Sequence, residues 1–275
     1  MNGQTVHFDR NAPVGIFDSG VGGLTVMRQI RRLLPQEHLI YLGDTARVPY
    51  GTKSPETVIR YATRCAQTLT ERGIKLLVVA CNTASAYALD ALRAGLQVPI
   101  IGVVEPGARA AVRSTRSGKI GVIGTPGTVR SGAYERVIHR LAPNTQVFLQ
   151  ACPLFVPLAE EGWVRGDVPF LAANRYLGRL KQRQVDTLVL GCTHYPLLRG
   201  VIRKVMGPDV SLVDSARETA RETRRILSAA GLIRGNAGPG KNLFLVTDNP
   251  NTFSGTGARF WGHPLEHVEW VDLNP

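Results

Sequence analysis

Short apolar runs, each ending in small or polar residues, recur along the whole chain. Two of them look like copies of one another: the run at 76–80 is followed by Cys81, and the run at 187–191 is followed by Cys192. An apolar run of about 4–8 residues with turn signals after it is typical of a buried parallel strand. The carboxyl end of such a strand is where open α/β sheets bind ligands. We therefore expect two thiols, far apart in the sequence, to occupy equivalent places in the fold.

The same pattern predicts strands and helices in alternation, which is typical of an α/β protein with parallel sheets. The expected strands cover residues 14–17, 39–42, 76–80, 98–104, 119–125, 147–150 and 187–191. The expected helices cover residues 24–34, 54–72, 82–94, 128–141 and 170–183. Pro35 ends the first of these helices, and Gly73 ends the second.

The last part of the chain departs from this alternation. Ser215 and Glu218 have the spacing of a capping box, which predicts a helix from there to about Ala230. Residues 241–247 and 267–273 are expected to form two more strands, with a loop of Gly, Asn and Thr between them. We expect this tail to return and complete the first half of the molecule.

Three landmarks of the first half recur in the second half in the same order. They are Gly15 and Gly121 with an offset of 106 residues, Val48-Pro49 and Val156-Pro157 with an offset of 108, and Cys81 and Cys192 with an offset of 111. Such ordered repetition indicates an internal duplication. The predicted fold is α/β, with two pseudo-symmetric open parallel-sheet lobes and the active site in the cleft between them. Residues 1–97 plus 208–275 would form the first lobe, and residues 98–207 the second.

The chain is strongly basic, with a net charge of +12 and a pI of about 10.1. Only six of its 33 basic residues are lysine, so arginine dominates. Such a charge is compatible with binding to nucleic acid or to a DNA-handling enzyme, which we keep as a secondary alternative. However, no basic run is interleaved with aromatic residues. The basic clusters fall on expected helices, where solvated faces are the ordinary explanation.

Cysteine usage and the absence of long apolar runs indicate a reducing, cytoplasmic setting. The four cysteines, Cys65, Cys81, Cys152 and Cys192, include no C-x-x-C pair, so neither a disulfide framework nor a zinc knuckle is indicated. Residues 1–12 lack the apolar core of a secretion signal. No apolar run approaches the ~18 residues needed to span a membrane.

Two thiols that face each other across a cleft suit one particular reaction. Inversion at a carbon acid needs a base on one face of the carbon and an acid on the other, and two equivalent residues from two lobes meet that need. The ordinary pKa of a thiol is about 8.5, and a helix N-terminus or a nearby imidazolium lowers it. We expect both cysteines to start helices, where the helix dipole favours the thiolate. The same helix ends, with Ser19, Thr83 and Thr193, would hold a carboxylate.

Three further ionisable residues are expected near the thiols. Asp18 follows the first strand at the edge that carries Cys81, and it could orient or deprotonate that thiol. His194 stands two residues after Cys192 and could exchange a proton with it. Glu160 follows the second Val-Pro landmark, with its neighbour Glu161 as a rival for the same role. The other two cysteines are expected to be small buried hydrophobes.

Five blocks of the sequence resemble the signature blocks of glutamate racemases. They cover residues 17–26, 43–51, 80–85, 152–157 and 191–198, and include Asp18-Ser19-Gly20, Cys81-Asn82-Thr83 and Cys192-Thr193-His194. The likeness extends over roughly residues 13–215. The resemblance implies a cofactor-independent isomerase that interconverts L- and D-glutamate and supplies D-glutamate for peptidoglycan synthesis. It also implies a homodimer, and neither pyridoxal phosphate nor a metal.

The resemblance further implies roles for individual residues. Cys81 would deprotonate the D enantiomer and Cys192 the L enantiomer, with Asp18, Glu160 and His194 as assisting groups. The implied substrate contacts are Asp18, Ser19, Tyr50, Gly51, Asn82, Thr83, Thr193 and His194.

Two other activities remain as alternatives. A racemase for aspartate or a related compound would use a similar scaffold with two cysteines. A dinucleotide-binding unit would also begin with a strand, a glycine-rich turn and a helix. However, Gly20-Val21-Gly22-Gly23 does not keep the G-x-G-x-x-G spacing of that unit.

Overall fold

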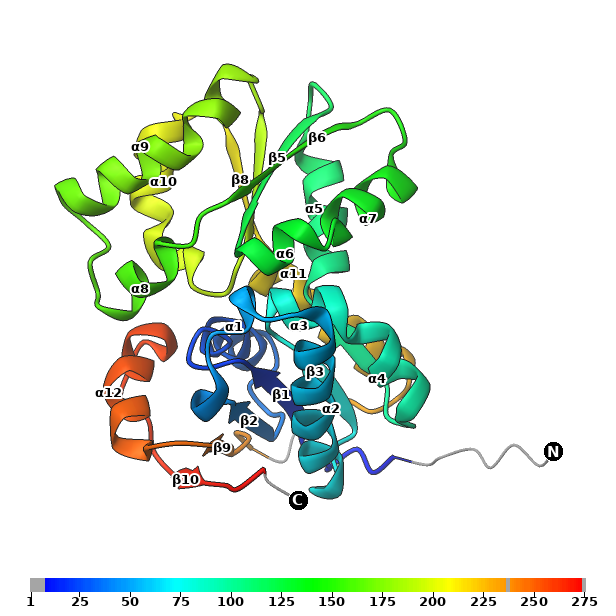
Figure 1. The fold of residues 1–275 in the computed structure, drawn as a ribbon. Coiled ribbons are helices and arrows are strands. Elements are labelled where there is room, and N and C mark those ends of the chain that lie inside the picture. The colour runs from blue at the N-terminus through cyan, green and yellow to red at the C-terminus, as the bar shows by residue number, and fades with distance from the viewer. Residues whose placement is uncertain (1–7, 236–237, 274–275) are drawn as a thin grey trace.

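Two parallel β-sheets, each covered by helices, form the two halves of the molecule (Figure 1). The computed structural model describes residues 8–235 and 238–273. The predicted α/β class with two open parallel sheets is confirmed. None of the helices in this part of the chain is long and apolar enough to cross a membrane.

The first sheet has six strands in the order β10-β9-β2-β1-β3-β4. The strands are β1 (Val14–Asp18), β2 (Leu39–Gly43), β3 (Leu76–Val79), β4 (Ile100–Gly102), β9 (Asn242–Val246) and β10 (Val268–Trp270). Every residue of β1, β2 and β3 is buried, because helices cover both faces of the sheet. β9 pairs with β2 and β10 pairs with β9, so the tail adds two strands to this sheet.

The second sheet has four strands in the order β6-β5-β7-β8. They are β5 (Lys119–Gly124), β6 (Gln146–Ala151), β7 (Thr187–Gly191) and β8 (Ser211–Asp214). This order repeats the β2-β1-β3-β4 order of the first sheet. The residue pairing repeats as well: Gly15 lies beside Ile40 and Leu77, and Gly121 lies beside Phe148 and Leu188. These pairs differ by 106, 108 and 111 residues, the offsets read from the sequence.

The helices pack on both faces of each sheet. They are α1 (Leu24–Leu33), α2 (Pro55–Glu71), α3 (Asn82–Tyr87), α4 (Leu89–Gly95), α5 (Val104–Ser114), α6 (Pro126–Arg130), α7 (Ala133–Leu141), α8 (Phe155–Glu160), α9 (Asp167–Gln182), α10 (Arg199–Met206), α11 (Ser215–Ala229) and α12 (Pro250–Trp261). Short 3-10 helices lie at Thr45–Arg47, Tyr50–Thr52 and Tyr195–Leu198.

Several predicted elements differ in the structure. The expected loop between the last two strands contains α12, because Asn249 caps a helix that starts at Pro250. The expected strand at 98–104 is only β4, and the chain turns into α5 directly after it. The expected helix at 128–141 is two helices, since Gly132 adopts a left-handed conformation with φ 61°.

The two sheets also exchange strands relative to the predicted lobe boundaries. β4 pairs with β3 in the first sheet, although residue 98 was expected to open the second lobe. β8 pairs with β7 in the second sheet, although residue 208 was expected to return to the first lobe. Asp214 then caps α11 by accepting from the Ala216 N–H, so the predicted capping role of Ser215 is wrong. We propose that the lobes divide after Gly102 and after Asp214.

A fully buried ion pair joins distant segments in the first half. Lys75 Nζ lies 2.5 Å from Glu37 Oε2, and both side chains are inaccessible to solvent. Lys75 also donates to the carbonyl oxygens of Arg10 and Leu232, and Glu37 accepts from the Arg234 N–H. Burial lowers the pKa of Lys75, and Glu37 opposes that change. The pair therefore ties the segment after α11 to the strands β2 and β3.

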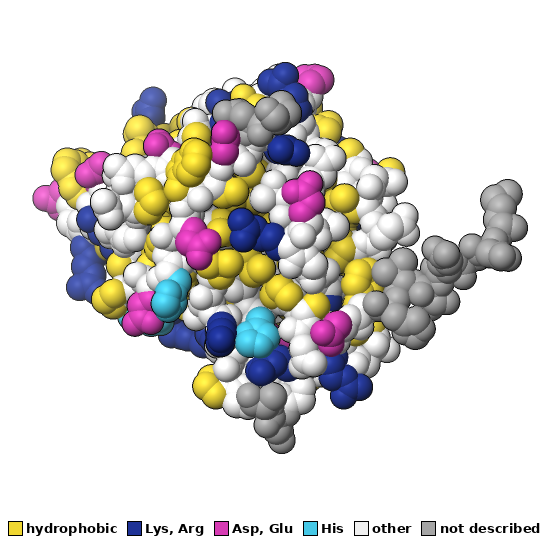
Figure 2. All heavy atoms as spheres, turned by 90° about the horizontal axis from the view of Figure 1, so that it is seen from below, with side chains coloured by type: hydrophobic (Ala, Val, Ile, Leu, Met, Phe, Trp, Pro, Cys, Tyr) yellow, Lys and Arg dark blue, Asp and Glu magenta, His cyan; other side chains and the backbone are white. Residues whose placement is uncertain are grey.

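Charged side chains of both signs are mixed on the face of the first half that Figure 2 shows. Described Lys and Arg side chains there alternate with Asp, Glu, His and exposed apolar groups. This face is not a continuous basic surface of the kind that nucleic-acid binding requires.

Removing one partner of the buried pair should strongly destabilise the fold. Lys75→Met leaves the Glu37 carboxylate buried without its cation, which costs about 3–5 kcal/mol. The urea unfolding midpoint, followed by circular dichroism, should fall accordingly. Lys181→Met on the exposed face of α9 is the matched control and should leave the midpoint unchanged. Equal midpoints for the two variants would contradict the structural role of the pair.

Candidate active site

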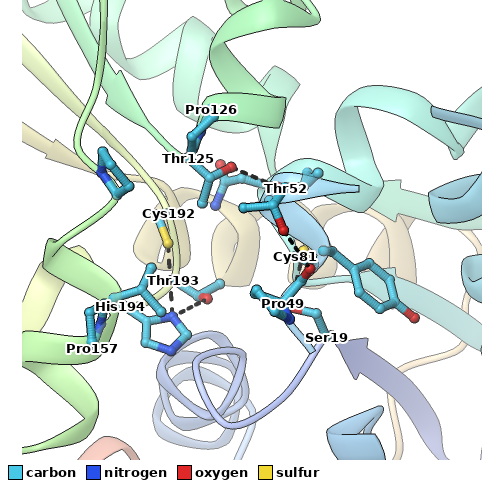
Figure 3. Close-up of a pocket in the computed structure, with 16 residues that line it drawn as sticks. Ser19, Pro49, Thr52, Cys81, Thr125, Pro126, Pro157, Cys192, Thr193 and His194 are labelled. Atoms are coloured by element: carbon cyan, nitrogen blue, oxygen red, sulfur yellow. Dashed lines mark hydrogen bonds between the residues drawn. The ribbon is translucent and has the colours of Figure 1, made fainter. Parts of the chain in front are cut away.

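A cavity of about 150 Å³ lies between the two sheets, at the carboxyl ends of their strands. Both predicted thiols line it, and Figure 3 shows them on opposite sides of the pocket. The lining residues are Ser19, Pro49, Tyr50, Gly51, Thr52, Cys81, Asn82, Thr83, Thr125, Pro126, Pro153, Val156, Pro157, Cys192, Thr193 and His194. Seven of the eight predicted substrate contacts therefore line the cavity. The eighth, Asp18, precedes the lining residue Ser19 in the chain.

Cys81 ends β3 and caps α3. Its Sγ accepts from the Ala84 N–H at 3.5 Å, and it lies 3.7 Å from the Ser19 hydroxyl. Burial, followed by the charge of Asp18, raises the pKa of Cys81 to about 12, against the smaller effects of these two hydrogen bonds. Desolvation therefore outweighs the expected effect of the helix dipole, and Cys81 is a thiol at neutral pH.

Cys192 does not start a helix, contrary to the prediction. It ends β7 and is followed by a turn that leads into the 3-10 helix Tyr195–Leu198. Its neighbour is a histidine and not a helix N-terminus: Cys192 Sγ lies 3.8 Å from His194 Nδ1 (Figure 3). The sequence prediction that His194 serves this thiol agrees with that contact.

Glu160 supports His194 from the side away from the cavity. Its Oε1 lies 2.9 Å from His194 Nε2, and its side chain is 43% exposed, whereas that of His194 is 7% exposed. Burial by itself would lower the pKa of His194, but hydrogen bonds to Cys192 and Glu160 raise it to about 10. The ring is therefore an imidazolium at neutral pH. Glu160 makes this contact, so the structure distinguishes it from its rival Glu161.

Asp18 is hydrogen-bonded to Thr193 of the second lobe. It is fully buried, its Oδ2 accepts from the Gly20 N–H, and its Oδ1 accepts from the Thr193 hydroxyl at 3.5 Å. Burial raises the pKa of Asp18, and the nearby His194 partly opposes that change. The Thr193 hydroxyl also lies 3.3 Å from His194 Nδ1, so it links the ionisable groups of the two lobes.

Asn82 and Tyr50 line the cavity from the first lobe. Asn82 Oδ1 accepts from Tyr134, whereas its buried Nδ2 has no hydrogen-bond partner among the described residues. Tyr50 lines the cavity, but its hydroxyl is bound to Asp44 in the core. Tyr50 is therefore placed to offer its ring or backbone, and not its hydroxyl, to a ligand.

Thr125 is a lining residue that the sequence prediction missed. It caps α6, and its hydroxyl lies 2.9 Å from that of Thr83 in the first lobe. The signal was present, because Thr125 stands 106 residues after Ser19, the offset that relates Gly121 to Gly15. The proline pair Pro49 and Pro157 was equally accessible through the offset of 108.

The glycine-rich turn after β1 is in close contact with Thr193 and His194 of the second lobe. A Cβ atom placed on Gly22 would lie 2.2 Å from Thr193 Oγ1 and 2.4 Å from His194 Nδ1. Thr25 reinforces the contact by donating its hydroxyl to the Thr193 carbonyl. Protein atoms thus occupy the place over the turn where a dinucleotide would need its pyrophosphate. Within the described residues, no three His, Cys, Asp or Glu side chains are grouped so as to hold a metal ion.

Residues 14–223 match the family model described as Asp/Glu/Hydantoin racemase. The chain belongs to this family. It is accordingly an isomerase of the racemase class, as expected from the sequence blocks. A curated glutamate racemase from Geobacter metallireducens is 57% identical over 94% of this chain and 96% of its own length.

Solved structures extend the likeness to the whole fold. Glutamate racemase from Thermus thermophilus, solved with β-chloro-D-alanine, is 49% identical with a TM-score of 0.88, covering 96% of this chain and 98% of its own. Glutamate racemase from Francisella tularensis, solved with D-glutamate, is 37% identical with a TM-score of 0.91, covering 96% and 99%. The predicted resemblance to glutamate racemases is confirmed.

The protonation of His194 is directly measurable. In a ¹⁵N NMR titration the ring should lose its proton with a midpoint near pH 10. Glu160→Gln should lower the midpoint, because a neutral amide no longer stabilises the cationic ring. Glu161→Gln is the matched control and should leave the midpoint in place. Since the folded pKa exceeds the ordinary 6.5, the stabilisation from this pair is fully present below about pH 6.5 and is lost as the pH rises through 10. A wild-type midpoint near 6.5 would contradict the described contacts.

The close approach at Gly22 should not tolerate a side chain. Gly22→Ala forces Thr193 and His194 away from the first lobe. A displacement of about 1 Å at a reacting centre costs about 100-fold in rate. Racemase activity and the melting temperature should be measured together. Gly178→Ala, where a Cβ meets nothing within 4 Å, is the control. Full activity in Gly22→Ala would show that the cleft does not need this contact.

Proposed function

We propose that the protein interconverts L- and D-glutamate by proton transfer at Cα, with Cys81 and Cys192 as the two acid–base groups. The observation that carries the proposal is the placement of two thiols, from equivalent strand ends of two sheets, on opposite sides of one small cavity. Its support from comparison is the 57% identity to a curated glutamate racemase.

The protonation of Cys81 suits the conversion of L-glutamate to D-glutamate. Cys81 is held as a thiol by burial, and it would donate a proton to one face of Cα. Cys192 Sγ lies 3.8 Å from Nδ1 of His194, so it can exchange a proton with that ring. Cys192 would thus remove the proton of L-glutamate while Cys81 delivers one to form D-glutamate. The two roles exchange in the reverse direction.

Neutral and charged donors around the cavity would hold the substrate. We propose that the free Nδ2 of Asn82 binds a carboxylate, since a buried donor without a partner is costly until a ligand satisfies it. Ser19, Thr83 and Thr193 add hydroxyls, and Gly51 lets the wall approach closely. We propose that Asp18, buried next to the cavity residue Ser19, acts on the substrate's ammonium group through its negative charge.

The cellular role follows from the product. We propose that D-glutamate made in the cytoplasm supplies peptidoglycan synthesis and that the protein works as a homodimer; both proposals rest on the resemblance. Aspartate is the alternative substrate. Assays of L-glutamate and L-aspartate at equal concentration, read by circular dichroism, should show turnover of glutamate.

Loss of either thiol should abolish racemisation without unfolding the protein. Cys81→Ser and Cys192→Ser each remove one proton-transfer group, and we expect a loss of at least about 1,000-fold. Cys65→Ser, at a buried thiol outside the cavity, is the matched control and should stay active. In D₂O the wild-type product should carry deuterium at Cα by NMR. Activity near the wild-type level in either cavity variant would exclude the mechanism with two thiols.

A further inference from the structure

The pair formed by His194 and Glu160 is held by a helix from the opposite lobe. The helix is α12, which follows β9 of the first sheet, whereas Glu160 ends α8 in the second half. Figure 1 shows α12 (orange) directly below α8 (green), on one side of the molecule. Two consecutive residues of α12, Arg259 and Phe260, contact the two members of the pair.

The α12 helix has a fixed position on the first lobe. Phe253, Phe260 and Trp261 are buried in the same apolar core as Leu24 of α1. Gly257 allows close packing there, because a Cβ at this position would lie 3.0 Å from Leu24 Cδ1. The helix is therefore packed into the core of the first lobe.

Arg259 fastens the end of α8. Its Nη1 donates to the main-chain carbonyl of Glu160, and its guanidinium packs 3.5 Å from the place of a Cβ on Gly162. The last carbonyls of a helix have no partner within the helix, and a cation there is favourable. This contact fixes the residue whose carboxylate lies on His194. Phe260 sets its ring against the imidazole, with centroids 5.1 Å apart at 74°.

We propose that Arg259 is a positioning residue for the proposed reaction, which it serves by holding Glu160 against His194 from across the cleft. The inference rests on the proposed function. Through Arg259, α12 of the first lobe would align His194 beside Cys192 when the two lobes come together. The inference concerns the Cys192 side of the cavity only. The described hydrogen-bond partners of Cys81 are Ser19 and Ala84. Both belong to the first lobe, just after β1 and β3.

The test is a double-mutant cycle on kcat/KM for glutamate. Arg259→Met should lower kcat/KM about tenfold, the effect of losing one charge-assisted hydrogen bond. In a Glu160→Gln background the same change should cost less than about twofold, because no carboxylate remains to be positioned. Arg259→Lys, which keeps a cationic donor, should recover most of the activity. Arg175→Met, at an exposed arginine of α9, is the control and should be silent.

A spectroscopic measurement separates this inference from the proposed function. The His194 imidazolium proton that is hydrogen-bonded to Glu160 should give a low-field ¹H resonance in the wild type and in Arg259→Lys. It should weaken or vanish in Arg259→Met and Glu160→Gln. Wild-type protein that keeps this pattern but does not racemise glutamate would overturn the proposed function alone. Additive losses in the cycle, or an unchanged resonance in Arg259→Met, would overturn the role of Arg259.

Discussion

The contact between the two lobes at the bottom of the cleft is the interaction on which the rest depends. A parallel sheet presents the carboxyl ends of its strands at one edge only, so a single sheet approaches a small ligand from one side. This chain approaches it from two sides by duplicating the sheet and turning the two edges toward each other. Side-chain hydroxyls and amides then join the lobes, as between Tyr134 and Asn82 and between Thr83 and Thr125. Glycine at position 22 makes the approach close enough for Thr193 and His194 to reach the first lobe.

The duplication is symmetric in scaffold and asymmetric in chemistry. Strand order and register repeat, and both thiols stand at corresponding strand ends. The ionisable neighbours do not repeat: the counterpart of Asp18 in the second half is Gly124, and the counterpart of His194 in the first half is Thr83. The lobes thus give two thiols in one geometry but in different electrostatic surroundings. That difference allows one thiol to be protonated while the other faces a cation.

The sequence was sufficient for features that depend on local pattern. Most of the strands, the offsets and the lining of the cavity by Cys81 and Cys192 follow from apolar periodicity and from small residues at turns. It was insufficient where tertiary packing decides. The segment 250–261, rich in Gly, Asn and Thr, was expected to be a loop, yet Gly257 is needed for close helix packing and Asn249 acts as a cap. The choice between Glu160 and Glu161 likewise depends on which side chain of a short helix faces His194, and adjacency in sequence carries no such information.

Desolvation explains why the helix end alone did not predict the protonation of Cys81. The pKa of Cys81 rises to about 12 although it caps a helix, because the thiol is buried and Asp18 lies near it. Under the proposed function, the substrate brings an ammonium group into the cavity, and an added cation favours the thiolate and opposes the effect of Asp18. A thiolate formed in such surroundings is a stronger base than one in water, which suits a weakly acidic carbon. Burial would thereby keep Cys81 protonated until a ligand of the right charge arrives.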